Sequence, residues 1–183
     1  MNFEDYKFGK EYENAHLSKL DLPPENIEMI LNWKVRDSGV FLFSGNPGVG
    51  KTYLAAALTK AWIEKGQSPR YLHEKTLFSN LRQGMNQNVD YDSEIRRLCD
   101  AEYFILDDLG SSRSGDTSHA SMTDWQKEVL LSFLDIRSAS MKPTLITTNL
   151  GMKEINDVLG PRFVSRLRGR NNRIMELIWK DKR

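Results

Sequence analysis

A glycine-rich octapeptide constrains this chain more than any other stretch. Residues 45–52 read Gly-Asn-Pro-Gly-Val-Gly-Lys-Thr, which is the G-x-x-x-x-G-K-T pattern of a phosphate-binding P-loop. The apolar run at 40–43 predicts a buried strand before it, and residues 53–65 have the composition of a helix after it. A turn between such a strand and helix directs backbone N–H groups and the positive end of the helix dipole at one anion. The octapeptide therefore predicts a site for a triphosphate.

The residues expected to hold the nucleotide are those of the loop and of the first helical turn. Lys51 is expected to neutralise the β- and γ-phosphates, and the hydroxyl of Thr52 to hold Mg²⁺. The alternative is an accidental match, which a chain of this length shows roughly once in a hundred cases. The flanking strand and helix favour the functional interpretation. The full set of expected nucleotide-binding residues is Asn46, Pro47, Gly48, Val49, Gly50, Lys51, Thr52 and Tyr53.

A second apolar strand, predicted at 103–106, ends in two acids, Asp107 and Asp108. An apolar strand that delivers a carboxylate at its C-terminal end is the Walker B pattern, which orients Mg²⁺ in a P-loop site. Asp107 is expected on the metal side, and Asp108 is expected to polarise the attacking water as a general base. The alternative is a surface loop that opens with two acids. The position of these acids after the P-loop, with a strand and helices between, favours the catalytic interpretation.

Two further polar features follow later in the chain. A strand predicted at 144–147 is followed by Asn149, whose amide would hold the attacking water against the γ-phosphate. The alternative for this asparagine is an ordinary turn residue. A short helix predicted at 161–167 presents Arg162 and Arg166 one turn apart, so both lie on one face.

The order of these elements predicts an α/β fold, a three-layer P-loop NTPase domain at 38–183 with a mainly parallel sheet of about five strands. Residues 1–37 are too short for a second domain and are expected to pack over the nucleotide. The polar stretch at 109–122 predicts a loop that could contact a partner through Arg113. Other strands are predicted at 70–73 and 172–178, and other helices at 25–35, 75–85, 93–99, 125–136 and 152–159.

Composition narrows the class of protein. The chain of 183 residues has one cysteine, which excludes an internal disulfide, and no apolar run of membrane-spanning length or secretory signal, so a cytoplasmic protein without membrane contact is expected. The net charge of +1 conceals a basic end: residues 161–183 hold eight Lys and Arg against two acids, 8 − 2 = +6. Such a surface favours phosphate-bearing partners, either nucleic acid or a neighbour's nucleotide. The three histidines and the cysteine lack metal-ligand spacing.

The P-loop, the paired acids, the Thr-Thr-Asn strand end and a Ser-Arg-Leu box at 165–167 occur here in that order. Together they resemble the AAA+ ATPases of the DnaC/IstB-like group, which are replicative helicase loaders and transposition helper ATPases. The resemblance covers nearly the whole chain. It implies an AAA+ core without a C-terminal helical lid, ATP and Mg²⁺ as cofactors, and Asn149 as the sensor 1 residue. It also implies that Arg166, with Arg162 as the competitor, is an arginine finger that reaches an adjacent subunit's nucleotide.

The expected function is an ATP-hydrolysing, self-associating loader or remodelling factor in DNA replication. Its expected partners are a replicative helicase or other nucleoprotein client and single-stranded DNA. The usual second Walker B residue is Glu, and Asp108 is one methylene shorter, so hydrolysis is expected to be slow, although the sequence Asp-Asp-Leu-Gly is familiar within this group. Alternatives are a transposition helper ATPase, a nucleotide-gated adaptor with negligible hydrolysis, and a small-molecule kinase, for which the sequence shows no acceptor pocket. The client, the assembly size and the choice between DNA and RNA stay open.

Overall fold

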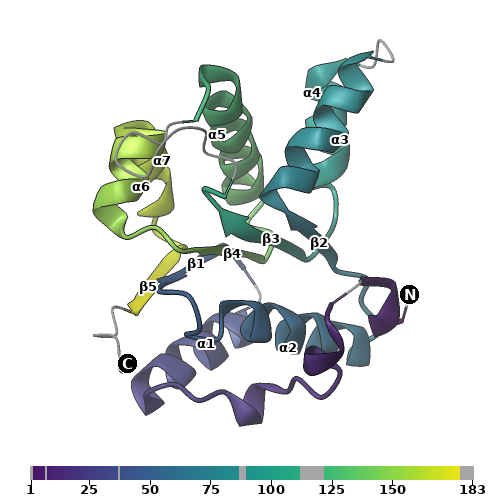
Figure 1. The fold of residues 1–183 in the computed structure, drawn as a ribbon, viewed down its shortest axis with the longest axis vertical. Coiled ribbons are helices and arrows are strands. Elements are labelled where there is room, and N and C mark those ends of the chain that lie inside the picture. Colours follow the sequence, from purple (N-terminus) through teal and green to yellow (C-terminus); the bar gives the residue numbers. More distant parts are fainter. Residues whose placement is uncertain (1, 7, 37, 87–89, 112–121, 178–183) are drawn as a thin grey trace.

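The computed structural model describes residues 2–6, 8–36, 38–86, 90–111 and 122–177. A five-stranded sheet in the order β2-β3-β4-β1-β5 forms its centre, and every neighbouring pair of strands is parallel (Figure 1). This arrangement confirms the predicted α/β P-loop NTPase fold. The strands are β1 (Val40–Gly45), β2 (Arg70–His73), β3 (Phe104–Leu109), β4 (Thr144–Thr148) and β5 (Arg173–Leu177).

Helices cover both faces of the sheet and complete the three layers (Figure 1). The first two lie on one face with the N-terminal segment, and the other five lie on the opposite face. They are α1 (Pro24–Arg36), α2 (Lys51–Glu64), α3 (Glu74–Asn86), α4 (Tyr91–Cys99), α5 (Asp124–Ala139), α6 (Met152–Leu159) and α7 (Pro161–Leu167). Three 3₁₀ turns precede α1, at Phe3–Tyr6, Lys10–Tyr12 and Leu17–Lys19.

The structure has a hydrophobic core on each face of the sheet, and side chains that alternate along the strands contribute to both. In β1, Phe41 and Phe43 face α2 and the N-terminal segment, whereas Val40 and Leu42 face the layer of α3 to α7, and all four are fully buried. Successive side chains of a strand point to opposite faces, so an uninterrupted apolar run suits a strand that is covered on both sides. The position of β1 between β4 and β5 fixes where the P-loop leaves the sheet.

Helix α2 lies close against the sheet because its inner surface is small. The alanines at 55–57 are buried, and Leu54, Leu58 and Trp62 recur at four-residue spacing and are fully buried. This close packing fixes the axis of α2, and with it the direction in which the helix N-terminus faces the P-loop.

Arg137 of α5 joins the amino ends of the strands, at the edge of the sheet away from the P-loop. Its side chain is fully buried and donates hydrogen bonds to five acceptors. Burial lowers the pKa of the guanidinium to about 10, so the group is still protonated at neutral pH. The acceptors are Thr144 Oγ1 and the backbone oxygens of Cys99, Ala101, Glu102 and Pro143.

Strand β3 corrects one sequence prediction. The strand was predicted over 103–106, ending in the two acids, but in the structure it begins at Phe104 and continues through both acids to Leu109, with a register shift against β4 between Leu106 and Leu109. The apolar pattern stops at Leu106, whereas backbone pairing resumes beyond the irregularity. The loop residue Arg113 and the basic residues after position 177 lie outside the described residues. Among the helices that are described, none is long and apolar enough to cross a membrane.

Candidate nucleotide-binding site

The P-loop connects the carboxyl end of β1 to the first turn of α2. Gly48 and Gly50 have φ angles of +88° and +92°, which L side chains rarely adopt, and a Cβ at either position would meet no atom within 4 Å. The glycines are therefore required by backbone conformation, and the space beside them is open. Gly50 is the N-cap of α2, so the exposed N–H groups of the helix start face this space.

Lys51 folds back over the loop. Its Nζ donates hydrogen bonds to the backbone oxygens of Gly45 at 2.7 Å and Asn46 at 2.8 Å. Burial lowers the pKa of the Lys51 ammonium, and the carboxylates of Asp108 and Asp107 oppose that shift. A mostly buried cation at a helix N-terminus provides a strong electrostatic attraction for an anion in the open space beside it.

The irregularity in β3 brings both acids to the P-loop side of the sheet. Adjacent residues of a regular strand point to opposite faces, so Asp107 and Asp108 would diverge without it. Asp108 instead adopts φ +62°, a left-handed conformation that aspartate tolerates better than most residues, and both acids line the same cavity. A β-bulge commonly re-aims a side chain beside a functional site in this way.

Asp107 is buried and held from two neighbouring strands. The hydroxyl of Tyr71 on β2 donates to Oδ2 at 2.7 Å, and the hydroxyl of Thr147 on β4 donates to Oδ1. Thr147 also accepts a hydrogen bond from the backbone N–H of Asp108 at 2.9 Å. Beyond it, the side-chain amide of Asn149 donates to Oδ1 of Asp108 at 3.2 Å. These bonds tie the tips of β2, β3 and β4 into one polar network.

A cavity of about 420 Å³ lies where these groups meet. Of the predicted site residues, Asn46 and Val49 belong to the loop but do not line the cavity. Three lining residues were missed by the sequence analysis as site residues: Tyr12 of the N-terminal segment, His73 at the end of β2, and Thr147. The complete lining is Tyr12, Pro47, Gly48, Gly50, Lys51, Thr52, Tyr53, His73, Asp107, Asp108, Thr147 and Asn149.

The donor set fits a Mg²⁺ ion bound together with phosphates. Thr52 and Asp107 line one cavity, and they offer a hydroxyl and a carboxylate oxygen, which are the hard ligands that Mg²⁺ prefers. In the described part of the chain, no group of three His, Cys, Asp or Glu side chains is placed to hold a metal by itself. A magnesium ion here would therefore depend on phosphate oxygens and water for most of its ligands.

The two candidate finger arginines lie apart from this cavity. Arg166 of α7 forms an ion pair with Asp135 of α5, with Nε 2.5 Å from Oδ1, and both side chains are substantially exposed. Arg162 lines a different hollow between α5 and the start of α7, together with Asp124 and Glu128. Neither arginine is among the residues that line the phosphate cavity.

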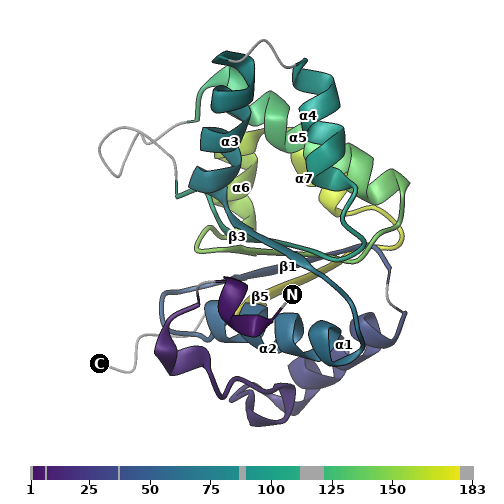
Figure 2. The same cartoon turned by 90° about the vertical axis from the view of Figure 1, so that its right-hand side faces the viewer.

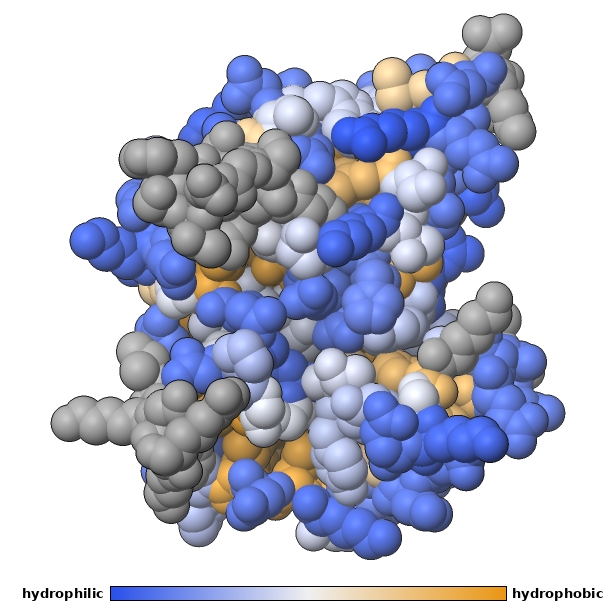
Figure 3. Space-filling model, viewed as in Figure 1, coloured by the Kyte–Doolittle hydropathy of each residue, from blue (hydrophilic) through white to orange (hydrophobic). Residues whose placement is uncertain are grey.

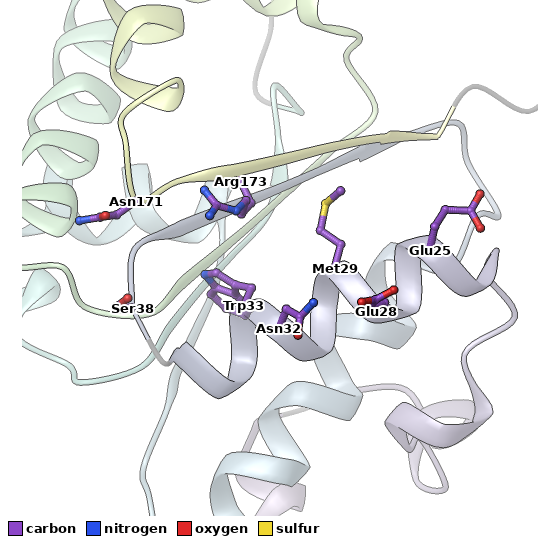
Figure 4. A pocket seen from close by; sticks show the side chains of 8 residues that line it. All are labelled: Glu25, Glu28, Met29, Asn32, Trp33, Ser38, Asn171 and Arg173. Carbon is purple, nitrogen blue, oxygen red and sulfur yellow. The ribbon is translucent and has the colours of Figure 1, made fainter.

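A separate hollow of about 280 Å³ lies between α1 and β5 (Figure 4). Its lining combines Trp33 and Met29 with the carboxylates of Glu25 and Glu28 and the guanidinium of Arg173. It shares no lining residue with the phosphate cavity. The face of the molecule seen in Figure 3 is mainly hydrophilic, with apolar areas that are small and separate.

The chain is similar to several known proteins in sequence and in fold. The profile of a family described as IstB-like ATP binding protein matches residues 3–166. The replicative helicase loader DnaC of Escherichia coli (strain K12) is 26% identical over 168 residues, which are 91% of this chain but 62% of that protein. A crystal structure of the DnaC helicase loader superposes with a TM-score of 0.72 at 28% identity, covering 94% of this chain and 100% of that chain. AMPPCP-bound DnaA from Aquifex aeolicus shares the fold, with a TM-score of 0.72 at 13% identity over 90% of this chain and 50% of that one.

Proposed function

Because the chain belongs to the family of IstB-like ATP-binding proteins, we propose that it binds and hydrolyses ATP with Mg²⁺. It would use this cycle to load or remodel a replicative helicase or another nucleoprotein complex in DNA replication. One observation carries the proposal: the P-loop and the polar tips of β3 and β4 converge on a single cavity large enough for a nucleotide's phosphates.

The lining residues that the sequence analysis predicted have roles that their positions support. The N–H groups of the P-loop and the ammonium of Lys51 bind the phosphates, so Lys51 exchanges the carbonyls of Gly45 and Asn46 for phosphate oxygens. Thr52 and Asp107 would hold Mg²⁺, and the ion would supply positive charge beside the phosphates. Asp108 takes a proton from the attacking water as general base, and Asn149 orients that water against the γ-phosphate.

The N-terminal segment supplies the part of the site beyond the phosphates. Tyr12 lines the cavity together with Tyr53 of α2, and the hydroxyl of Tyr53 accepts a hydrogen bond from the backbone N–H of His16 at 3.2 Å. Two aromatic rings on adjoining segments suit stacking with a nucleobase. We place the nucleobase on this side, with residues 1–37 as a wall of the site and residues 38–183 as the ATPase domain.

We further propose that the protein self-associates through its nucleotide, with Arg166 as the finger that contacts the next subunit's γ-phosphate. A guanidinium suits this role because it is always charged and can contact two phosphate oxygens at once. The exposed ion pair with Asp135 keeps Arg166 at the surface and would exchange one carboxylate for phosphate on assembly. Arg162, which lines another hollow, is the weaker candidate.

The client is inferred from the relatives alone. The chain spans 62% of the length of the Escherichia coli helicase loader, so the loader's partner and activity are proposals for this chain. A replicative helicase is the proposed client, single-stranded DNA is a proposed second ligand, and the cytoplasm is the proposed location. Transposition helper activity remains the alternative within the same family.

A nucleotide-gated adaptor with negligible turnover is the second candidate, and the geometry of Asp108 favours it. The carboxylate is one methylene shorter than glutamate, and one of its oxygens already accepts the amide of Asn149. ATP turnover with and without single-stranded DNA separates the two functions. An ATPase exceeds the rate of an Asp108→Ala variant, whereas an adaptor gives the same background rate in both proteins.

Sedimentation velocity with a non-hydrolysable ATP analogue tests self-association. We expect the analogue to produce an oligomer from the wild-type protein and from Arg162→Ala, which is the matched control. Arg166→Ala should bind the nucleotide with unchanged affinity and remain less associated. A wild-type protein that binds the analogue but stays monomeric at every concentration would refute the finger and the assembly together.

A further inference from the structure

Tyr71 lies between the N-terminal segment and the metal-side carboxylate, and the mechanism proposed above gives it no role. It stands on β2, which is an edge strand of the sheet. Its ring packs against the ring of Phe8, with centroids 4.4 Å apart, and its hydroxyl donates to Oδ2 of Asp107 at 2.7 Å. One side chain therefore contacts both the segment that covers the edge and the acid that faces the phosphates.

The N-terminal segment is fastened to this edge by several independent contacts. Phe3 stacks on Phe8 at 5.3 Å, and the ammonium of Lys60 on α2 lies 4.9 Å above the ring of Phe3. The hydroxyl of Tyr6 donates to the backbone oxygen of Pro69, just before β2, at 2.7 Å. Figure 2, which looks onto the β2 side of the sheet, shows these first turns lying against α2 beside the strand. The position of the Tyr71 ring thus depends on how this segment is seated.

The hydrogen-bond network around Tyr71 has a defined direction. An ionised carboxylate can only accept, so the phenol proton points to Asp107. The phenol oxygen is then an acceptor, and Nε2 of His73 lies 3.0 Å from it. His73, which lines the cavity, therefore adjoins the hydroxyl group that holds Asp107.

We propose that Tyr71 is a positioning residue that couples the seating of the N-terminal segment to the orientation of Asp107, and so sets how strongly nucleotide binding depends on Mg²⁺. The inference rests on the proposed function, since it concerns the same site. Thr147 fixes Oδ1 of Asp107, and Tyr71 fixes Oδ2, so removal of either hydroxyl frees the carboxylate to rotate. Partners that orient a metal ligand are typically worth about 10- to 100-fold in metal affinity.

Equilibrium binding of a fluorescent ATP analogue, titrated with Mg²⁺ at fixed nucleotide, tests this coupling without any need for turnover. Tyr71→Phe keeps the ring and removes only the hydroxyl, which donates to Asp107 and lies 3.0 Å from Nε2 of His73. We expect its nucleotide affinity in EDTA to stay within about twofold of wild type, and the Mg²⁺ concentration at half-maximal enhancement to rise about tenfold or more. Tyr6→Phe is the matched control, because it removes a phenol donor at the same edge without contact to Asp107.

Phe8→Ala tests the link to the N-terminal segment and leaves every hydroxyl in place. We expect a shift in Mg²⁺ dependence in the same direction as Tyr71→Phe but smaller. The double variant should resemble Tyr71→Phe alone, because the two changes act through one contact. If Tyr71→Phe does not fold, as judged by its thermal transition, Phe8→Ala alone decides the coupling.

The outcomes separate this inference from the proposed function. A wild-type protein that binds no nucleotide refutes the proposed function. A wild-type protein whose binding is enhanced by Mg²⁺, with Tyr71→Phe and Phe8→Ala showing the same Mg²⁺ dependence, refutes the inference about Tyr71 and leaves ATP binding intact. An equal shift in Tyr6→Phe also refutes it, because general loosening of the edge would then explain the effect.

Discussion

Replacement of Arg137 by methionine should destabilise the protein strongly while sparing its nucleotide site. Methionine keeps most of the aliphatic volume but removes all five donated hydrogen bonds at the amino ends of β3 and β4. These bonds lie at the edge of the sheet opposite the P-loop, so the phosphate cavity loses no direct contact.

The magnitude follows from the acceptors that would be left behind. Two of the five keep another partner: the backbone oxygen of Pro143 also accepts the N–H of Phe104, and the hydroxyl of Thr144 also donates to Lys142. The other three are the backbone oxygens at 99, 101 and 102. A buried acceptor left unsatisfied costs about 1–3 kcal/mol. Because water can satisfy some of these acceptors, we expect the free energy of unfolding to fall by about 3–5 kcal/mol. This corresponds to a decrease in Tm of roughly 6–20 °C for a domain of this size.

Thermal unfolding followed by circular dichroism measures this loss, with Arg97→Met as the matched control. Arg97 makes a 2.6 Å ion pair with Glu94 on the surface of α4, with its side chain 63% exposed, so its replacement should change stability by about 0.5 kcal/mol at most. Nucleotide affinity at low temperature should be the same in both variants. A Tm for Arg137→Met within about 2 °C of the control would refute the argument that these carbonyls depend on the guanidinium.

Two further predictions concern the polar network. Thr147→Val removes the hydroxyl that holds Oδ1 of Asp107 and accepts the N–H of Asp108. We expect the factor by which Mg²⁺ enhances nucleotide affinity to fall about 10-fold in this variant. Thr147→Ser keeps the hydroxyl and should retain the enhancement in the same titration. Asp108→Ala should be about 1 kcal/mol less stable to urea than Asp108→Asn, because asparagine, like the native aspartate, tolerates φ +62° better than alanine does. Equal urea midpoints would show that this backbone conformation is not strained. Both Asp108 variants should lose any ATP turnover of the wild-type protein.

The sequence was sufficient to predict the sheet and the phosphate loop because both leave strong local patterns. Four consecutive apolar residues before the octapeptide correctly predicted β1, and Gly160 followed by proline at 161 correctly separated α6 from α7. These elements are set by local propensity and by alternation, which can be read over a few residues. The expected helix bounds accordingly differ from the structure by only a few positions.

The site residues that the sequence analysis missed, and the full length of β3, depend on contacts between segments that are distant in the sequence. Such contacts cannot be predicted from local patterns in a single sequence. His73 and Tyr71 reach the site because β2 pairs with β3 in a register that places His73 opposite Asp107. Thr147 reaches the carboxylate of Asp107 and the backbone N–H of Asp108 because β3 pairs with β4. The continuation of β3 past the two acids depends on a register shift in the same pair. Hydrophobic periodicity predicts none of these strand pairings. An aromatic residue and a histidine near the carboxyl end of a predicted strand could still have indicated that these side chains lie near the site.

The irregularity in β3 also makes the strand sensitive to its own length. Removal of one residue between 104 and 106 would move every later side chain of the strand to the opposite face of the sheet, and Asp107 would then face the layer of α3 to α7. Removal of two would restore the parity but withdraw the carboxylate by about 6.6 Å from the P-loop. Insertions and deletions in this protein should therefore be tolerated in the connecting loops long before they are tolerated in this one strand, whatever residues are added or lost.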